Sequence, residues 1–212
     1  MAEVDHPLLF DEETHVYTVN GEELPSVTQI LKAARLIDYS MIPQPILQAA
    51  AHRGSAVHQI LELLDNDLLD PASEIDGGIA GYVGAAIQFY KDAQFEPYLV
   101  EYRNYHRTYR YAGTLDRTGI LAGKQRVIVD FKTGIILPGH ALQLAAYLAM
   151  LGNSRSYRRI ALQLKEDGTY KVHEYPSTTH RDDFEIFLSA LRCWRWNESQ
   201  GNQDRAAAGR LF

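Results

Sequence analysis

The feature that most constrains this chain is a short apolar run that ends in opposite charges. Val127, Ile128 and Val129 are consecutive β-branched residues, which is typical of a strand buried on both faces. Asp130 and Lys132 follow within three positions. Burying either charge costs several kcal/mol unless it is paired or binds a metal. We therefore expect the fold to be built around a buried strand whose end carries a polar site.

The geometry of a strand predicts how these charges meet. Side chains alternate between the two faces of a sheet, so Asp130 and Lys132 should share one face and Phe131 should point to the other. Asp116 lies near the middle of the preceding predicted strand. A hairpin between the two strands would gather two carboxylates and one ammonium, which suits a divalent cation beside a phosphate. Taken alone, an ion pair between Asp130 and Lys132 explains the pattern equally well.

Four motifs in and around this region share the order found in one enzyme family. They are Arg53-Gly54-Ser55-Ala56-Val57-His58, Gly113-Thr114-Leu115-Asp116, Asp130-Phe131-Lys132-Thr133-Gly134 and Gln143-Leu144-Ala145-Ala146-Tyr147. Together, over residues 53–147, they resemble the RecB-like branch of the PD-(D/E)xK nuclease superfamily. The segment Pro25–Leu31 is also similar to small phage exonucleases and to the mitochondrial single-strand exonuclease of this branch.

The resemblance implies a fold and a set of site residues. The expected fold is α/β, with a restriction-endonuclease-like core in which helices flank a central mixed β-sheet, preceded by an N-terminal β-hairpin and a helical cover. Asp116, Asp130 and Lys132 are the expected catalytic residues. The expected cofactor is Mg²⁺ or Mn²⁺, held by His58, Asp116, Asp130 and the carbonyl oxygen of Phe131. Oxygen ligands with one imidazole suit these ions.

Further residues are expected to line the site. Gln143 and Tyr147 are four apart on a predicted helix and so share a face; the resemblance implies that they and Arg53 contact the substrate, although helix packing also explains the pair. Glu101 is a second-rank candidate, because a cross-strand ion pair would account for it as well. Glu62 lies one turn after His58, and a solvated position explains it too.

Periodicity and turn residues predict the elements and their grouping. The hairpin is expected over residues 8–24, with helices opening at Ser26 and over 46–64, 79–93, 140–151 and 181–197. Strands are expected over 98–106, 111–121, 157–164 and 169–175, with the buried strand ending at Lys132. We expect one domain over 1–212: an N-terminal hairpin and helical part over 1–95, a catalytic sheet with flanking helices over 96–200, and a flexible tail over 201–212.

Composition narrows the class of protein. The chain has 212 residues, enough for one core, and no stretch approaches the ~18 apolar residues of a membrane span. Its one cysteine excludes an intrachain disulfide and the four-cysteine iron–sulfur cluster of some RecB-like nucleases. The start of the chain lacks a signal segment, so we expect a protein that is not secreted but cytoplasmic, in a bacterial, phage-infected or prophage-bearing cell.

The charge balance bears on nucleic-acid binding. A net charge of −6 argues against high-affinity binding of duplex DNA, which usually requires a basic face. Carboxylates gathered at a metal site account for part of this charge until the cation binds. Arg103, Arg107 and Arg110 form one basic stretch, which is either a solvated face or a binding surface.

The resemblance implies a DNA nuclease that leaves a 5′-phosphate and a 3′-hydroxyl. The sequence contains no motif that reads bases, so we expect recognition of ends or structures. The expected protein is an exonuclease that prefers single-stranded DNA ends, in recombination, repair or phage DNA processing, with a helicase or recombination protein as a conceivable partner. The alternatives are a structure-specific endonuclease of the same fold, a non-cleaving DNA-binding or partner-binding protein, and a phosphohydrolase of free nucleotides. The oligomeric state is left open.

Overall fold

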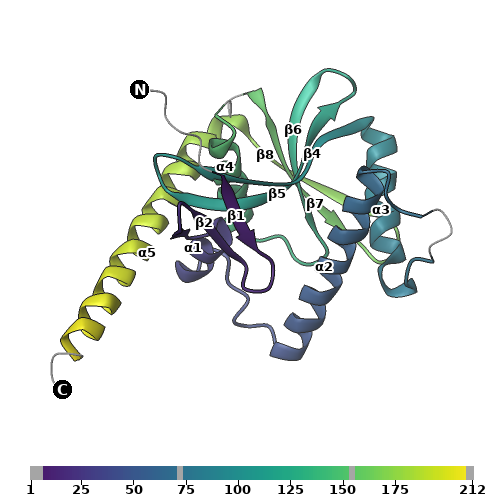
Figure 1. Cartoon of the computed structure of the whole chain (residues 1–212). Helices are drawn as coiled ribbons and strands as arrows, with labels where there is room; N and C mark the ends of the chain where they lie inside the picture. Colours follow the sequence, from purple (N-terminus) through teal and green to yellow (C-terminus); the bar gives the residue numbers. More distant parts are fainter. Residues whose placement is uncertain (1–6, 71–73, 153–155, 209–212) are drawn as a thin grey trace.

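A five-stranded sheet runs through the centre of the molecule (Figure 1). The computed structural model describes residues 7–70, 74–152 and 156–208, with the helix backbone alone over 202–208. The sheet has the order β4-β5-β6-β7-β8, and only the β6–β7 pair is parallel, so the sheet is mixed. Its strands are β4 (Phe95–His106), β5 (Tyr111–Leu121), β6 (Gln125–Lys132), β7 (Arg158–Leu164) and β8 (Tyr170–Tyr175).

Helices cover both faces of this sheet and make the fold three-layered (Figure 1). One face packs against α1 (Val27–Ala33), α4 (Gly139–Met150) and α5 (His180–Ala208), and a short 3₁₀ helix, η2 (Ser177–Thr179), precedes α5. The other face packs against α2 (Gln44–Asp65) and α3 (Gly77–Ala93). The expected α/β class, with a mixed sheet flanked by helices, is confirmed.

The buried strand β6 divides the core in two, as its sequence predicts. Ile128 belongs to the cluster under α1, α4 and α5, whereas Val127, Val129 and Phe131 belong to the cluster under α2 and α3. All four side chains are at most 1% exposed. Alternation therefore directs Asp130 and Lys132 toward the α4 face, where they meet the helix that follows the strand.

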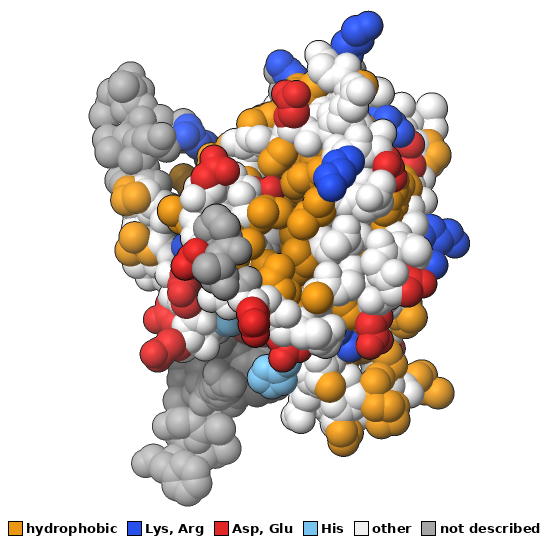
Figure 2. All heavy atoms as spheres, turned by 90° about the vertical axis from the view of Figure 1, so that its right-hand side faces the viewer, with side chains coloured by type: hydrophobic (Ala, Val, Ile, Leu, Met, Phe, Trp, Pro, Cys, Tyr) orange, Lys and Arg blue, Asp and Glu red, His pale blue; other side chains and the backbone are white. Residues whose placement is uncertain are grey.

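Apolar side chains also reach the surface on the side of α2 and α3. Figure 2 views that side of the molecule and shows an irregular strip of apolar side chains bordered by acidic and basic ones. Partly buried residues of both helices pack on the second core cluster, among them Ile60, Leu64 and Ile79. Within the described ranges, no helix combines the length and the apolar character that crossing a bilayer requires.

The N-terminal region departs from the single hairpin expected over residues 8–24. It forms a three-stranded antiparallel sheet of β1 (Leu8–Asp11), β2 (Val16–Val19) and β3 (Glu22–Leu24). The Asn20-Gly21 turn is present, with both residues at positive φ as a tight hairpin turn requires. A second turn, in which the Asp11 carboxylate accepts a bond from the Thr14 N–H (2.8 Å), was missed because it contains no glycine.

Two helix boundaries also differ from expectation. The helix expected from residue 79 begins two residues earlier, at Gly77, because the Asp76 carboxylate accepts a bond from the Gly78 N–H (2.7 Å) and caps α3. Residues 71–73, in the preceding connection, lie outside the described residues. The helix expected to end at residue 197 continues as α5 to Ala208, where its last residues are a run of alanines, the strongest helix formers.

Glycine is required at position 113 because β5 lies very close to Tyr147 of α4 at this point. A β-carbon at this position would lie 2.7 Å from Cε1 of Tyr147 on α4. Tyr147 is 4% exposed, so its ring has little room to move. We expect Gly113→Ala to lower the free energy of unfolding by about 1–3 kcal/mol through overpacking, measured by urea denaturation.

The matched control for this prediction is Gly84→Ala. Gly84 is exposed on α3, and a β-carbon there meets nothing within 4 Å. That variant should be as stable as the wild type or more stable, by up to about 1 kcal/mol, because alanine favours the helix. A Gly113→Ala protein that unfolds at the wild-type urea concentration would show that the Tyr147 ring is free to shift.

Candidate functional site

Three potential metal ligands converge from three separate elements. His58 from α2, Glu101 from β4 and Asp116 from β5 place their ligand atoms within 4.8 Å of one another. His58 Nδ1 lies 3.2 Å from Glu101 Oε1, and His58 Nε2 lies 3.7 Å from Asp116 Oδ2. Asp116 is buried, and the other two are partly buried. This cluster, which we call the ligand cluster, could hold a metal ion.

The end of the β5–β6 ladder places Asp116 in this cluster. Backbone pairing between the two strands stops at Arg117 and Val129. Beyond that pair, Asp116 Oδ2 accepts a bond from the Phe131 N–H (2.7 Å), so a side chain replaces a backbone acceptor. The Phe131 carbonyl oxygen lies 3.3 Å from His58 Nε2. Phe131, expected to contribute its carbonyl, therefore borders the ligand cluster.

Strand alternation is interrupted at the level of the cluster. Leu115 faces the α4 side, yet the Arg117 guanidinium, two residues on, stacks over the Phe131 ring on the opposite side at 5.4 Å. In the neighbouring strand, Glu101 has φ +43°, in the left-handed region. Such a conformation costs a non-glycine residue of order 1–3 kcal/mol and persists only when its surroundings hold it in place. Here it directs the Glu101 side chain toward His58.

A buried arginine holds Glu101 in this position. Arg117 is fully buried; its Nη1 donates to Glu101 Oε1 (2.9 Å) and its Nε to Asp65 Oδ2 (2.5 Å). The Tyr90 hydroxyl donates to the same Asp65 oxygen (3.0 Å). Sequence analysis missed Arg117, because Asp116 and Thr118 flank it in the sequence and a charge within a polar stretch does not indicate burial. Asp65 was missed as well, because it lies at a helix end, where a solvated carboxylate is common.

Asp130 and Lys132 form a second group beside the ligand cluster. Lys132 Nζ lies 2.6 Å from Asp130 Oδ2, and Asp130 is 1% exposed. The side-chain amide of Gln143 donates to Asp130 Oδ1 (3.2 Å) and to the Tyr147 hydroxyl (3.1 Å). Asp130, expected as a metal ligand, thus faces Lys132 and Gln143 and lies outside the group formed by His58, Glu101 and Asp116.

Two cavities open onto these groups. One, of about 850 Å³, is lined by His58, Phe131 and Lys132 together with Arg53. Arg53 donates to the Thr133 carbonyl oxygen (3.2 Å), so its backbone contact fixes it on the cavity wall. The other cavity, of about 310 Å³, is lined by Glu101, Glu62 and Tyr147. Glu62 is exposed there, in keeping with a solvated position. Every expected site residue thus lines a cavity or lies against one that does.

The charges of the site shift the ionisation of its members. Burial alone would lower the pKa of His58, but the Asp116 and Glu101 carboxylates outweigh it and raise the pKa to about 9. Burial also opposes the charge on Lys132, yet Asp130 and Asp116 raise its pKa above the ordinary value. Burial raises the pKa of Asp116. Lys132 is therefore an ammonium at neutral pH, and a proton on His58 offsets the carboxylates when no cation is bound.

No protein-family model matches this chain, and no curated protein matches it either.

The His58 pKa predicts how stability depends on pH when no metal ion is present. The pKa is higher in the folded protein than in the unfolded chain, where it is about 6.5, so proton binding stabilises the folded state. The contribution, up to about 3 kcal/mol, is complete below pH 6.5 and is lost as the pH rises through about 9.

Urea denaturation with a chelator, from pH 6 to pH 9.5, measures this loss in the wild type. His58→Gln should flatten the profile, whereas His52→Gln, at an exposed position on the same helix, should leave it unchanged. A wild-type profile that is already flat would contradict the assignment.

The geometry also predicts which carboxylates bind a cation. Glu101→Gln and Asp116→Asn should weaken Mn²⁺ binding by at least tenfold, because each removes an oxygen of the ligand cluster. Asp130→Asn should weaken it less, since Asp130 faces Lys132. Isothermal titration calorimetry or Mn²⁺ electron paramagnetic resonance gives the three affinities. A larger loss for Asp130→Asn than for Glu101→Gln would restore Asp130 as a direct ligand.

Proposed function

We propose that this chain is a metal-dependent deoxyribonuclease with a restriction-endonuclease-like core, of the RecB-like branch of the PD-(D/E)xK superfamily. The observation that carries the proposal is the position of the ligand cluster directly beside the buried Asp130–Lys132 pair. A structural ion pair alone does not account for His58, a strained Glu101 and Asp116 at the same place. Cation ligands next to a fixed ammonium are what hydrolysis of a phosphodiester requires.

The donor set suits Mg²⁺ or Mn²⁺. His58, Glu101, Asp116 and the Phe131 carbonyl oxygen offer three oxygen donors and one imidazole nitrogen, a mainly hard set in which the nitrogen favours manganese slightly. When bound, such an ion polarises a phosphodiester oxygen and lowers the pKa of water. His58 must lose its proton to become a ligand, so cation binding and proton release are coupled.

Lys132 supplies positive charge for the transition state. It is an ammonium held by the Asp130 carboxylate, and it lines the 850 Å³ cavity together with His58. A fixed cation that faces the reacting phosphate stabilises the negative charge that develops as the nucleophile attacks. Gln143 fixes the second Asp130 oxygen and so sets the orientation of the pair. In this scheme Asp130 and Gln143 position Lys132.

The substrate we propose is single-stranded DNA, whose free end enters the site. The two cavities that flank the cluster, of about 850 and 310 Å³, are of the size of small-ligand pockets and suit a few nucleotides of one strand. Arg53 and Lys32 line the larger one. The overall charge of −6 argues against high-affinity binding of a duplex. An exonuclease acting in recombination, repair or phage DNA processing is consistent with these features.

The test is Mg²⁺-dependent digestion of labelled oligonucleotides. Wild type should degrade linear single strands, and Lys132→Ala should lower the rate by at least a hundredfold, the usual effect of removing one transition-state donor. Lys171→Ala, on the exposed strand β8 at the opposite sheet edge from β4, is the charge-matched control and should retain the wild-type rate. Circular dichroism shows whether each variant is folded.

Other substrates separate the remaining classes. Efficient cutting of closed circles would identify an endonuclease, and release of phosphate from free nucleotides would identify a nucleotide phosphohydrolase. DNA binding without cleavage in the presence of either metal ion would identify a non-cleaving protein of this fold. Full activity of Lys132→Ala would overturn the proposed chemistry.

A further inference from the structure

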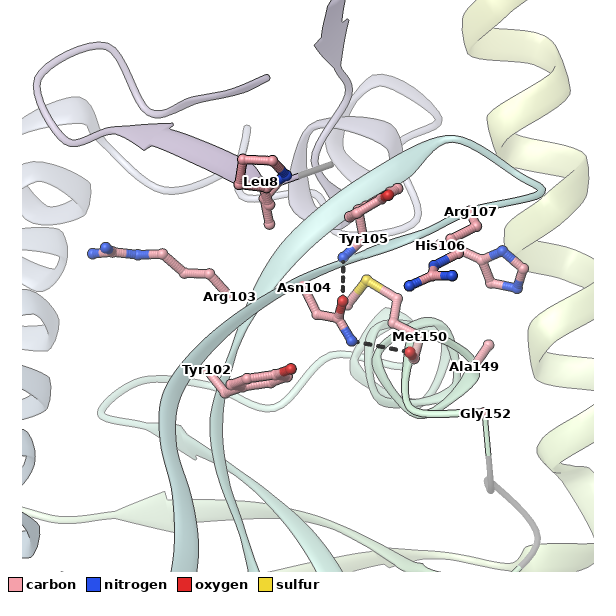
Figure 3. A pocket seen from close by; sticks show the side chains of 11 residues that line it. Leu8, Tyr102, Arg103, Asn104, Tyr105, His106, Arg107, Ala149, Met150 and Gly152 are labelled. Atoms are coloured by element: carbon pink, nitrogen blue, oxygen red, sulfur yellow. Dashed lines mark hydrogen bonds between the residues drawn. The ribbon is translucent and has the colours of Figure 1, made fainter. Parts of the chain in front are cut away.

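The hollow along the second half of β4 uses its polar groups for contacts within the chain. It measures about 720 Å³ and lies between β4 and the end of α4 (Figure 3). There the Asn104 amide donates to the Met150 carbonyl oxygen (3.0 Å), as Figure 3 shows. Arg103 pairs with Glu12 (2.9 Å) and lies over the Phe10 ring. A donor that is not used in this way lies elsewhere, in the 850 Å³ cavity beside the ligand cluster.

The donor is the hydroxyl of Tyr39, which lines that cavity together with Lys132. Tyr39 belongs to the connection between α1 and α2, and its ring packs on the core cluster under α1, α4 and α5. This connection touches the start of α4, because a β-carbon on Gly139 would lie 2.2 Å from the Leu36 carbonyl oxygen. The close approach places Tyr39 against the next residue of α4, His140.

Two hydrogen bonds determine the tautomer of His140. The Leu137 N–H donates to His140 Nδ1 (3.2 Å), so Nδ1 carries no proton. The ring is 1% exposed, and burial together with the charge of Lys132 lowers the pKa of His140 to about 4. The imidazole is therefore neutral at pH 7 and has one N–H. That proton is on Nε2, which donates to the Tyr39 hydroxyl oxygen (3.3 Å).

The hydroxyl proton of Tyr39 is consequently directed away from His140. A hydroxyl has one proton to donate, and the bond from His140 occupies a lone pair and not that proton. Within the part of the chain that the structure describes, this is the one hydrogen bond that the hydroxyl forms. Burial raises the pKa of Tyr39, so the proton is retained at neutral pH. The wall of the cavity thus carries an oriented donor whose acceptor is not a residue of the described chain.

We infer that the Tyr39 hydroxyl donates to a phosphate oxygen of the strand bound in the 850 Å³ cavity, beside the Lys132 ammonium. The phosphate is the part of a nucleic acid that accepts bonds from lysine and tyrosine side chains together. Tyr39 is then a substrate-binding residue, and His140 is a positioning residue that acts through it. That this phosphate belongs to the strand being cleaved rests on the proposed function, whereas its binding does not.

Mg²⁺-dependent hydrolysis of a labelled 20-mer of thymidylate tests the donor. Tyr39→Phe should lower kcat/KM by at least tenfold, because it removes a hydrogen bond to a charged group and keeps the ring. Tyr170→Phe is the matched control: this hydroxyl, on β8, donates to Asp92 (2.8 Å) outside the cavity, and the variant should keep the wild-type value. Both variants should retain the wild-type circular dichroism and Mn²⁺ affinity.

Two substitutions of His140 separate positioning from packing. His140→Gln places an amide nitrogen near the position of Nε2, so it should keep the bond to Tyr39 and most of the activity. His140→Asn keeps an acceptor for the Leu137 N–H but loses the donor to Tyr39, and kcat/KM should fall severalfold. In the Tyr39→Phe background, His140→Asn should have no further effect. An equal loss in both backgrounds would show that His140 does not act through Tyr39.

Binding without hydrolysis identifies the group that Tyr39 contacts. Fluorescence anisotropy in the presence of a chelator gives the affinities for the thymidylate 20-mer and for an abasic 20-mer with the same phosphates. Tyr39→Phe should weaken binding of both strands severalfold and by the same factor, because the contact is to the backbone. A loss confined to the thymidylate strand would place a base at Tyr39 and overturn the phosphate assignment.

The two assays together separate this inference from the nuclease proposal. Equal kcat/KM for wild type and Tyr39→Phe would overturn the inference and leave the nuclease standing. If the wild type does not cleave, the nuclease proposal falls, and weaker binding of both strands by Tyr39→Phe still supports the phosphate contact. A wild type that binds neither strand, or binds both no better than Tyr39→Phe, overturns that contact.

Discussion

The site depends on one hydrogen bond at the point where the β5–β6 ladder stops. There the Phe131 N–H has no backbone acceptor and donates to the Asp116 carboxylate. A buried N–H left without a partner would cost about 1–3 kcal/mol. The bond therefore stabilises the backbone and also holds the Asp116 carboxylate in place. The backbone carbonyl oxygen of the same residue, Phe131, lies beside His58. The ligand cluster therefore lies where the β5–β6 ladder ends. There the Asp116 carboxylate takes the place of the missing backbone acceptor.

Around this bond the charges are arranged in two layers. The cluster itself holds His58, Glu101 and Asp116, with two carboxylates against one imidazole. Beside it lie two cations of different kinds: the buried Arg117 is shared between Glu101 and Asp65, and the partly buried Lys132 pairs with Asp130. Arginine suits the first position because its planar fork binds two carboxylates at once, whereas the compact ammonium of lysine suits a place on a cavity wall. The negative charge of the site is thus only partly neutralised, which favours a divalent cation.

The sequence predicts the secondary-structure elements and the Asp130–Lys132 pair better than the side-chain contacts of the ligand cluster. The buried strand, its alternation and the pairing of Asp130 with Lys132 follow from local rules, and so do the helices and strands of the main sheet. The place of Glu101 beside His58 does not follow from these rules, because it depends on a positive φ in β4 and on a switch of faces near Asp116, and neither has a local signal in the sequence. The burial of Arg117 was not predictable either, because Asp116 and Thr118 flank it and its partner Asp65 is distant in sequence.

The order of the strands determines when the site can exist. His58, Glu101, Asp116 and Phe131 come from four elements of the chain, and β6 becomes an interior strand only when β7 pairs beside it in parallel. Parallel pairing requires the whole crossover through α4, so β7 can join the sheet only after that segment of the chain has been made. A ribosome-bound chain that has not yet released β7 has no finished sheet to support the cluster. The polypeptide consequently completes the support of the ligand cluster only when most of it has been synthesised, and shorter products of translation lack that support.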